Sequence, residues 1–298
     1  MQIDYYADWA HDNYVPMDRH SDGGTAFYLG HLQGEAVQGA QSRPMALRFE
    51  LQGWKDEQVL LPARANSGDG VYAWFGPTAE NRDTTLALID PATPHWLLQT
   101  LDEVIAKVPG YFQRALRRRP AETPLVMIGT DGFDHPGRSI KGGALPGQIV
   151  FTISGRHLLE ASDEAKAQVQ HLVAHELAHV WQNALSQGGI GESDPWVHEG
   201  GAEAMSLTAL RHTGLWTAEQ AERFGTGLAE ECVRAEQKAA PENAWRMNYT
   251  CGYRRFLAYP LAPIRLWRRL IDESERSGEV YSENLVERVL STKNDHSR

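Results

Sequence analysis

The stretch that most constrains this chain is the run HLVAHELAHVW, from His171 to Trp181. It contains the pattern His-Glu-x-x-His, formed by His175, Glu176 and His179. On an α-helix, residues four apart lie on one face, about 6 Å apart along the axis, so the two histidines can hold one metal ion. Glu176 projects about 100° around the helix, beside the metal, where a base acting on a metal-bound water must lie. The stretch therefore predicts the catalytic helix of a zinc hydrolase.

Local signals predict that this pattern lies on one helix, from about Asp163 to Ser186. Ser162 is a suitable N-cap, and Asp163 and Glu164 place negative charge in the first turn. No Pro or Gly interrupts residues 165–185, and their apolar side chains recur at helical spacing. The residues next to the two histidines are apolar, which indicates a partly buried helix rather than a solvated one that carries the motif by chance.

A second predicted helix supplies a third ligand. Asp194 as N-cap and Pro195 at the first helical position predict a helix that runs to about Arg211. Glu199 and Glu203 are four residues apart, so both face the same way. Glu199 can complete a His-His-Glu site that leaves one position open for water. Glu203, one turn further on, can accept a hydrogen bond from a liganding histidine.

Two glycines, Gly200 and Gly201, interrupt this second helix. Each costs roughly 1 kcal/mol of helix stability relative to Ala. Such a cost is usually accepted where another backbone comes close. We expect that backbone to belong to the metal-binding helix.

Together the two segments resemble the gluzincin metallopeptidases, and most of all the aminopeptidase N-like and glycyl aminopeptidase-like enzymes. The resemblance covers about residues 123–258 and rests on His175-Glu176-Leu177-Ala178-His179 and Trp196-Val197-His198-Glu199-Gly200-Gly201-Ala202-Glu203. It implies one zinc ion per chain, held by the two histidines and Glu199. It also implies a thermolysin-like catalytic domain, Glu176 as general base and a peptide or protein as substrate.

The resemblance implies roles for two further segments. Tyr249 matches the Tyr of a gluzincin Tyr-x-x-Gly segment, which donates a hydrogen bond to the oxyanion, with Tyr253 as the alternative. Gly142, Gly143 and Ala144 lie where gluzincins bind the substrate backbone by β-augmentation. The Glu that holds the substrate's amino terminus in aminopeptidase N-like enzymes has no counterpart here, so endo- and exopeptidase action both stay open. A packing tyrosine and an ordinary Gly/Pro turn are the alternative readings.

Periodicity along the whole chain predicts an α+β fold. Residues 1–90 read as a mainly β N-terminal domain, a small sandwich or curled sheet, and residues 91–298 as the catalytic domain. The predicted strands are 46–51, 59–61 and 71–75 in the first domain, and 124–129 and 148–153 in the second. We expect a loop at 130–142, a mixed sheet whose last strand borders the cleft, and a mostly helical remainder.

Composition limits the partners and the compartment. The chain has 298 residues and a net charge of −10, which argues against nucleic acid or anionic membranes as main partners. No apolar run reaches transmembrane length, and the first residues lack the pattern of a signal peptide. The compartment stays open: cytoplasmic as read, exported if a leader has been removed. Cys232 and Cys251 can pair in an exported protein, but two cysteines do not require it.

Two other functions are compatible with the motifs. One is a zinc hydrolase that acts on a non-peptide amide, an epoxide or a related small substrate on the same fold. The other is a non-catalytic, gluzincin-like protein that binds zinc for structure. Glu176 argues against the second, because a structural zinc site has no need of a base.

Overall fold

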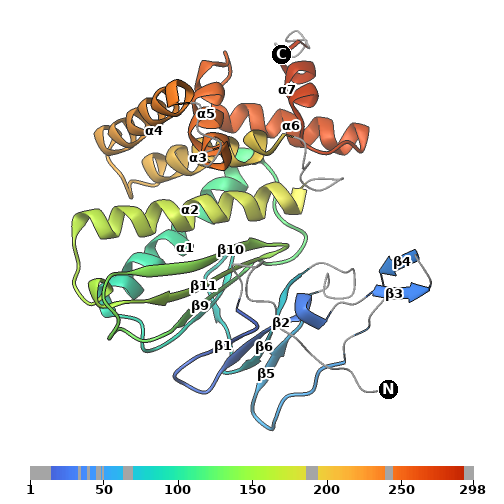
Figure 1. The fold of residues 1–298 in the computed structure, drawn as a ribbon, viewed down its shortest axis with the longest axis vertical. Coiled ribbons are helices and arrows are strands. Elements are labelled where there is room, and N and C mark those ends of the chain that lie inside the picture. Colours follow the sequence, from blue (N-terminus) through green and yellow to red (C-terminus); the bar gives the residue numbers. More distant parts are fainter. Residues whose placement is uncertain are drawn as a thin grey trace. The chain divides into compact units, whose positions relative to one another are not determined.

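The computed structural model describes residues 15–32, 35–38, 41–44, 48, 50–62, 70–185, 194–238 and 244–291 (Figure 1). Contacts divide the chain into two compact units, one of Met1–Gln99 and Glu122–Ala165, the other of Thr100–Ala121 and Lys166–Arg298. The described strands lie in the first unit and most of the helical residues in the second, which confirms the predicted α+β class. The first unit extends across the domain boundary predicted at residue 90.

An antiparallel sheet in the first unit has the strand order β1-β2-β6-β5. Its members are β1 (Met17–Arg19), β2 (Thr25–Tyr28), β5 (Gln58–Leu60) and β6 (Tyr72–Gly76). The short strands β3 (Glu35–Gln38) and β4 (Gln41–Pro44) form a separate pair. The strands predicted at 59–61 and 71–75 correspond to β5 and β6. Of the strand predicted at 46–51, residues 46, 47 and 49 lie outside the described residues, and residues 48, 50 and 51 are not part of a strand.

A mixed sheet in the same unit has the order β10-β11-β9-β8-β7. Its strands are β7 (Glu80–Asn81), β8 (Leu86–Ile89), β9 (Leu125–Thr130), β10 (Ser139–Leu145) and β11 (Gln148–Ser154). The prediction of a loop over 130–142 was wrong at its end, because residues 139–142 belong to β10, which lies at one edge of the sheet beside β11. The reason is the turn at Pro146 and Gly147, where φ of +74° at the glycine folds β10 back onto β11.

Side chains from both sheets share one core. Tyr72 and Trp74 of the first sheet pack with Met127, Leu145 and other apolar residues of the second. The Gln148 side chain adds a pair of 2.8 Å hydrogen bonds with the backbone N–H and C=O of Tyr72. The two sheets are therefore joined by a common apolar layer and by a buried polar link.

Helix α3 packs against several of the other helices. The helices are α1 (His95–Leu116), α2 (Asp163–Leu185), α3 (Pro195–His212), α4 (Ala218–Lys238), α5 (Ala244–Ala258), α6 (Pro263–Ser277) and α7 (Glu283–Ser291). In the yellow-to-red part of Figure 1, α3 contacts α4, α5 and α6. Thr217 and Gln220 exchange hydrogen bonds of 3.1 and 2.9 Å at the start of α4, a capping box.

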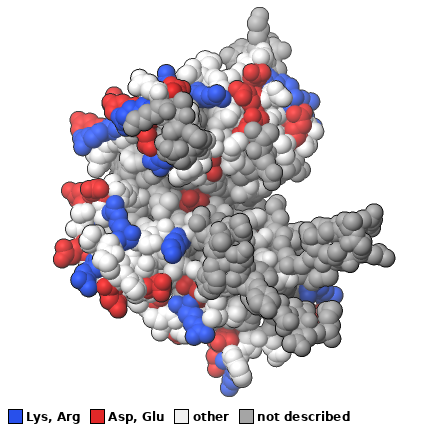
Figure 2. Space-filling view, viewed as in Figure 1, with Lys and Arg blue, Asp and Glu red and all other residues white. Residues whose placement is uncertain are grey.

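A disulfide between Cys232 and Cys251 joins α4 to α5, which resolves the pairing that the sequence left open. Acidic and basic side chains are interspersed over the exposed surface of these helices (Figure 2), with ion pairs such as Arg254–Glu236 at 3.0 Å. Among the described residues, no helix is long and apolar enough to cross a membrane.

Candidate metal centre

Helix α2 holds the two histidines of the motif in a buried environment. Its first turn is capped by Ser162, whose Oγ accepts the backbone N–H of Ala165 at 3.1 Å, as the sequence predicted. His175 is 3 % exposed and His179 is 8 % exposed. Both rings project toward α3, so they contribute to an internal site rather than to a solvated surface.

Helix α3 brings two carboxylates to this site. It starts at Pro195, but the Asp194 side chain does not cap it as predicted. Instead Asp194 Oδ2 accepts the backbone N–H of Glu283 at 3.2 Å, at the start of α7. Glu199 and Glu203, one turn apart, both reach α2.

Three ligand-type atoms converge here. His175 Nε2 lies 2.9 Å from His179 Nε2, and Glu199 Oε2 lies 3.3 Å from the first nitrogen and 3.1 Å from the second. Zinc bonds of about 2.0–2.1 Å in a tetrahedral site separate neighbouring ligand atoms by roughly 3.3 Å. The cluster is therefore of the right size for one zinc ion, and it consists of the donor types that zinc prefers.

The far sides of both rings show why the Nε2 atoms face each other. His179 Nδ1 donates to Gln182 Oε1 at 2.9 Å, and the Gln182 amide donates to the carbonyl oxygen of His198 at 3.1 Å. His175 Nδ1 faces Glu203 Oε1 at 3.5 Å, a long contact. With protons on both Nδ1 atoms, both Nε2 lone pairs point into the cluster, an arrangement that requires a cation or a proton between them.

Two contacts of this site were not predicted. Gln182 was missed, although its place three residues after His179 is a spacing that brings helical side chains together. His198 was left out of the predicted site, because neighbouring residues project about 100° apart on a helix, but its Nε2 lies 3.4 Å from Glu199 Oε1. The angle between neighbouring residues on the helix does not predict this contact, because the long side chain of Glu199 can reach toward its neighbour.

The charges of the site are strongly coupled. Burial lowers the pKa of His175, but the surrounding glutamates outweigh it and raise the pKa from 6.5 to about 9. Burial raises the pKa of Glu203, but the positive charges of His171 and His175 bring it down to about 2. Burial also opposes ionisation of Glu199, yet hydrogen bonds from three histidines hold its pKa far below 4.5. A metal ion in the cluster would therefore replace a proton.

Glu176 and Tyr249 lie beside the cluster. The half-buried Glu176 is close enough to raise the pKa of both His175 and Tyr249 through its negative charge. The Tyr249 ring stacks on the His175 ring, with centroids 5.5 Å apart and planes inclined by 20°, and its hydroxyl lies near enough to the Glu199 carboxylate for that group to raise the pKa of Tyr249. Tyr253 points elsewhere: its hydroxyl lies against Gly225 of α4. Of the two tyrosines considered from sequence, the structure brings Tyr249 to the site.

The glycines of α3 have a different neighbour from the one expected. A Cβ on Gly200 would lie 2.2 Å from the carbonyl carbon of Gly252, and one on Gly201 would lie 2.4 Å from Trp267 Nε1. The prediction of a close approach to α2 was therefore wrong. Gly200 lets α5 cross α3 closely, and α5 is the helix that carries Tyr249.

Gly142, Gly143 and Ala144 lie in β10, in the first unit. Gly142 has φ of +118°, and a Cβ there would meet the backbone oxygen of Val150 at 1.9 Å. These residues form the edge strand of the mixed sheet rather than a loop. Their role in substrate binding stays a prediction.

One protein-family model matches part of this chain. Residues 95–227 match the model of a family described as "Peptidase of plants and bacteria", a segment that contains α2 and α3. Among solved structures, an aminopeptidase N family protein from Idiomarina loihiensis is similar with a TM-score of 0.44 and 11% identity. That match covers 72% of this chain and 44% of the other, so this chain spans less than half of that protein's length. No curated protein matches the chain. The family match supports a peptidase.

Proposed function

We propose that this chain is a zinc-dependent peptidase of gluzincin type, with one zinc ion held by His175, His179 and Glu199. The observation that carries the proposal is the convergence of two Nε2 atoms and one carboxylate oxygen within 2.9–3.3 Å of one another in a buried cluster. The match of residues 95–227 to a peptidase family supports the reaction class. A peptide or protein is the proposed substrate.

Zinc in such a site polarises a carbonyl group and lowers the pKa of water. The chain's own residues then handle the protons. Glu176, which follows the first ligand, takes a proton from the attacking water and passes it to the leaving amine. Tyr249 donates a hydrogen bond to the carbonyl oxygen as that oxygen gains negative charge. Burial and the nearby carboxylates raise the pKa of Tyr249, so the hydroxyl keeps its proton at neutral pH and remains a donor.

The Cys232–Cys251 disulfide bears on the compartment. Disulfides persist in oxidising surroundings and are rare in the cytosol. Of the two compartments left open by the sequence, we therefore favour an exported enzyme.

Substitution of Glu176 by Gln tests the proposal, with Glu164→Gln, at the exposed start of the same helix, as the matched control. We expect purified wild-type protein to contain about one zinc ion per chain and to cleave members of a mixed fluorogenic peptide library. Glu176→Gln should keep the zinc and lose about 10²–10⁴-fold in cleavage rate, because an amide cannot accept the proton. Full turnover by Glu176→Gln, or cleavage that survives complete removal of zinc, would contradict the mechanism.

A further inference from the structure

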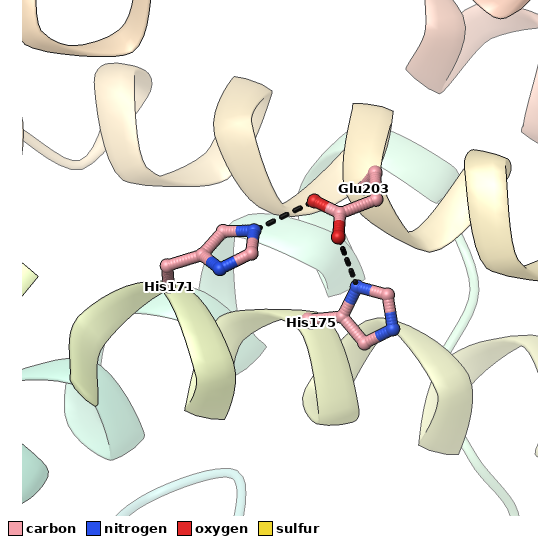
Figure 3. A group of neighbouring side chains, drawn as sticks. All are labelled: His171, His175 and Glu203. Carbon is pink, nitrogen blue, oxygen red and sulfur yellow. Dashed lines mark hydrogen bonds and ion pairs between the residues drawn. The ribbon is translucent and has the colours of Figure 1, made fainter. Parts of the chain in front are cut away.

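His171 lies one turn before His175 on α2 and has no part in the proposed ligand set. Its Nε2 lies 2.6 Å from Oε2 of Glu203, a carboxylate on α3 whose side chain is 6 % exposed. The other oxygen of the same carboxylate, Oε1, lies 3.5 Å from His175 Nδ1. Figure 3 shows Glu203 between the two rings, with one oxygen turned toward each. Glu203 is thus hydrogen-bonded to His171 and lies within ion-pair distance of His175, one turn further along the same helix.

The direction of these contacts follows from the carboxylate. An ionised carboxylate only accepts hydrogen bonds, so the proton of the 2.6 Å contact belongs to His171 Nε2. For the same reason Glu203 favours the form of His175 that carries its proton on Nδ1. That form leaves the Nε2 lone pair directed at His179 and Glu199.

The His171 ring is itself fixed by packing. Its centroid lies 4.4 Å from the Phe224 ring and 6.3 Å from the Trp216 ring. Trp216 in turn donates from Nε1 to Gln170 Oε1 at 2.8 Å. Because these contacts restrain the ring, His171 offers its N–H to Glu203 from a defined position.

His171, His175 and Glu203 could also be read as a second metal site. Two observations argue against that reading. The 2.6 Å separation of His171 and Glu203 is a short hydrogen bond, well below the roughly 3.3 Å between two ligands of a tetrahedral zinc ion. The two oxygens of Glu203 are also directed at different rings rather than at one common point.

We propose that His171 is a positioning residue of the metal site. It holds one oxygen of Glu203, so that the other oxygen orients His175 with its Nε2 lone pair toward the metal. His171 touches neither metal nor substrate and acts through Glu203. This inference rests on the proposed function, because it takes the cluster of His175, His179 and Glu199 to be the zinc site.

Replacements of His171 that differ in reach provide the test. The side-chain N–H of Gln can take the place of His Nε2–H, whereas the shorter Asn cannot reach Glu203. We would measure zinc affinity by chelator competition, and zinc stoichiometry, for wild type, His171→Ala, His171→Asn and His171→Gln. His212→Ala, an exposed histidine on α3, is the control.

Loss of a partner outside the ligand set typically weakens metal binding by roughly 10–100-fold. We expect His171→Ala and His171→Asn to fall in that range and Glu203→Gln to match them. His171→Gln should recover most of the affinity, and His212→Ala should not change it. Proton NMR of the zinc-loaded protein should show the His175 Nδ1–H resonance in wild type and His171→Gln, and its loss or broadening in the other two His171 variants. Denaturant unfolding of each variant separates this role from a general loss of stability.

Several results would overturn the inference. Unchanged zinc affinity in His171→Ala would show that His171 does not position the metal site. Equal losses in His171→Gln and His171→Asn would leave it only a packing role. Two zinc ions in wild type and one in His171→Ala would make it a ligand. If wild-type protein bound no zinc, the proposed function would fail together with this inference, whereas normal wild-type binding with unaffected variants would overturn this inference alone.

Discussion

The crossing of α3 and α5 offers a direct test of how the site is built. A Cβ added at Gly200 would lie 2.2 Å from the Gly252 carbonyl carbon, 2.3 Å from its Cα and 2.6 Å from the Tyr253 nitrogen. Ordinary contact begins at 3.4 Å, so the two backbones would have to separate by 1.2 Å. All three obstructing atoms belong to the backbone of α5, and no side-chain rotation can relieve the overlap.

The magnitude for Gly200→Ala follows from two opposing effects. Alanine gains about 1 kcal/mol of helix propensity over glycine. Overpacking costs about 1–3 kcal/mol and sometimes more, and a clash between two backbones belongs at the upper end of that range. We therefore expect a net loss of about 2 kcal/mol of unfolding free energy.

The same displacement should affect catalysis through Tyr249. This residue stacks on His175 from α5, so a movement of α5 moves its hydroxyl. A misplacement of about 1 Å can cost roughly 100-fold in rate. We expect Gly200→Ala to lose activity on this scale while it retains part of its zinc affinity, since two of the three ligands lie on α2.

Denaturant unfolding and peptide cleavage would be measured side by side, with Gly227→Ala as the matched control. Gly227 also lies within a helix, α4, but a Cβ there meets nothing within 4 Å. The control should be as stable as wild type, or up to about 1 kcal/mol more stable, and fully active. A Gly200→Ala protein with the stability and activity of the control would refute the reasoning that close packing of α3 on α5 positions the site.

Three further outcomes can be checked. Burial, opposed by a 2.8 Å hydrogen bond from Thr152, raises the pKa of Asp18 to about 6. Because the pKa of Asp18 in the folded state is raised from 3.8, the stability that this group contributes is fully present below pH 4, and the unfolding free energy falls by up to about 3 kcal/mol as pH rises through 6. Asp18→Asn should therefore be more stable than wild type in urea at pH 7.5 and as stable as wild type at pH 4. Replacing Cys232 and Cys251 together by Ala should lower the unfolding free energy by about 3 kcal/mol, because the disulfide closes a loop with a sequence separation of 19. A reductant should lower the unfolding free energy of wild type by the same amount and should not change that of the variant. His175→Ala with His179→Ala should abolish zinc binding by metal analysis, and full zinc occupancy in that protein would show the ligand assignment to be wrong.

Features that depend on neighbours along the chain could be predicted from the sequence. The residue range of α2, the Thr217–Gln220 capping box and the α+β class follow from hydrogen bonds and side-chain spacing within a few residues. The candidate ligands on α2 and on α3 could be predicted for the same reason, because residues four apart on one helix share a face in any fold. The structure brings these predicted ligands together, within 3.3 Å.

The hairpin of β10 and β11 shows a limit of local reasoning. Pro146 and Gly147 signal a turn, but a turn alone does not say whether the chain before it pairs as a strand. Residues 139–145 contain adjacent glycines, which weaken any strand signal. Pairing with β11 decides the matter, because the backbone groups of β10 that face β11 gain partners there whatever side chains the residues carry.

The tertiary structure alone decided what lies between the helices. Gly200 faces α5 and not α2, since the path of the chain after α3 determines which helix can approach that face. Glu203 contacts two histidines one turn apart, because α3 lies across α2 at their level. The sequence determines which side chains share a face of one helix through a repeat of 3.6 residues per turn. Which two faces meet depends on the packing of the whole core, and no local repeat records it.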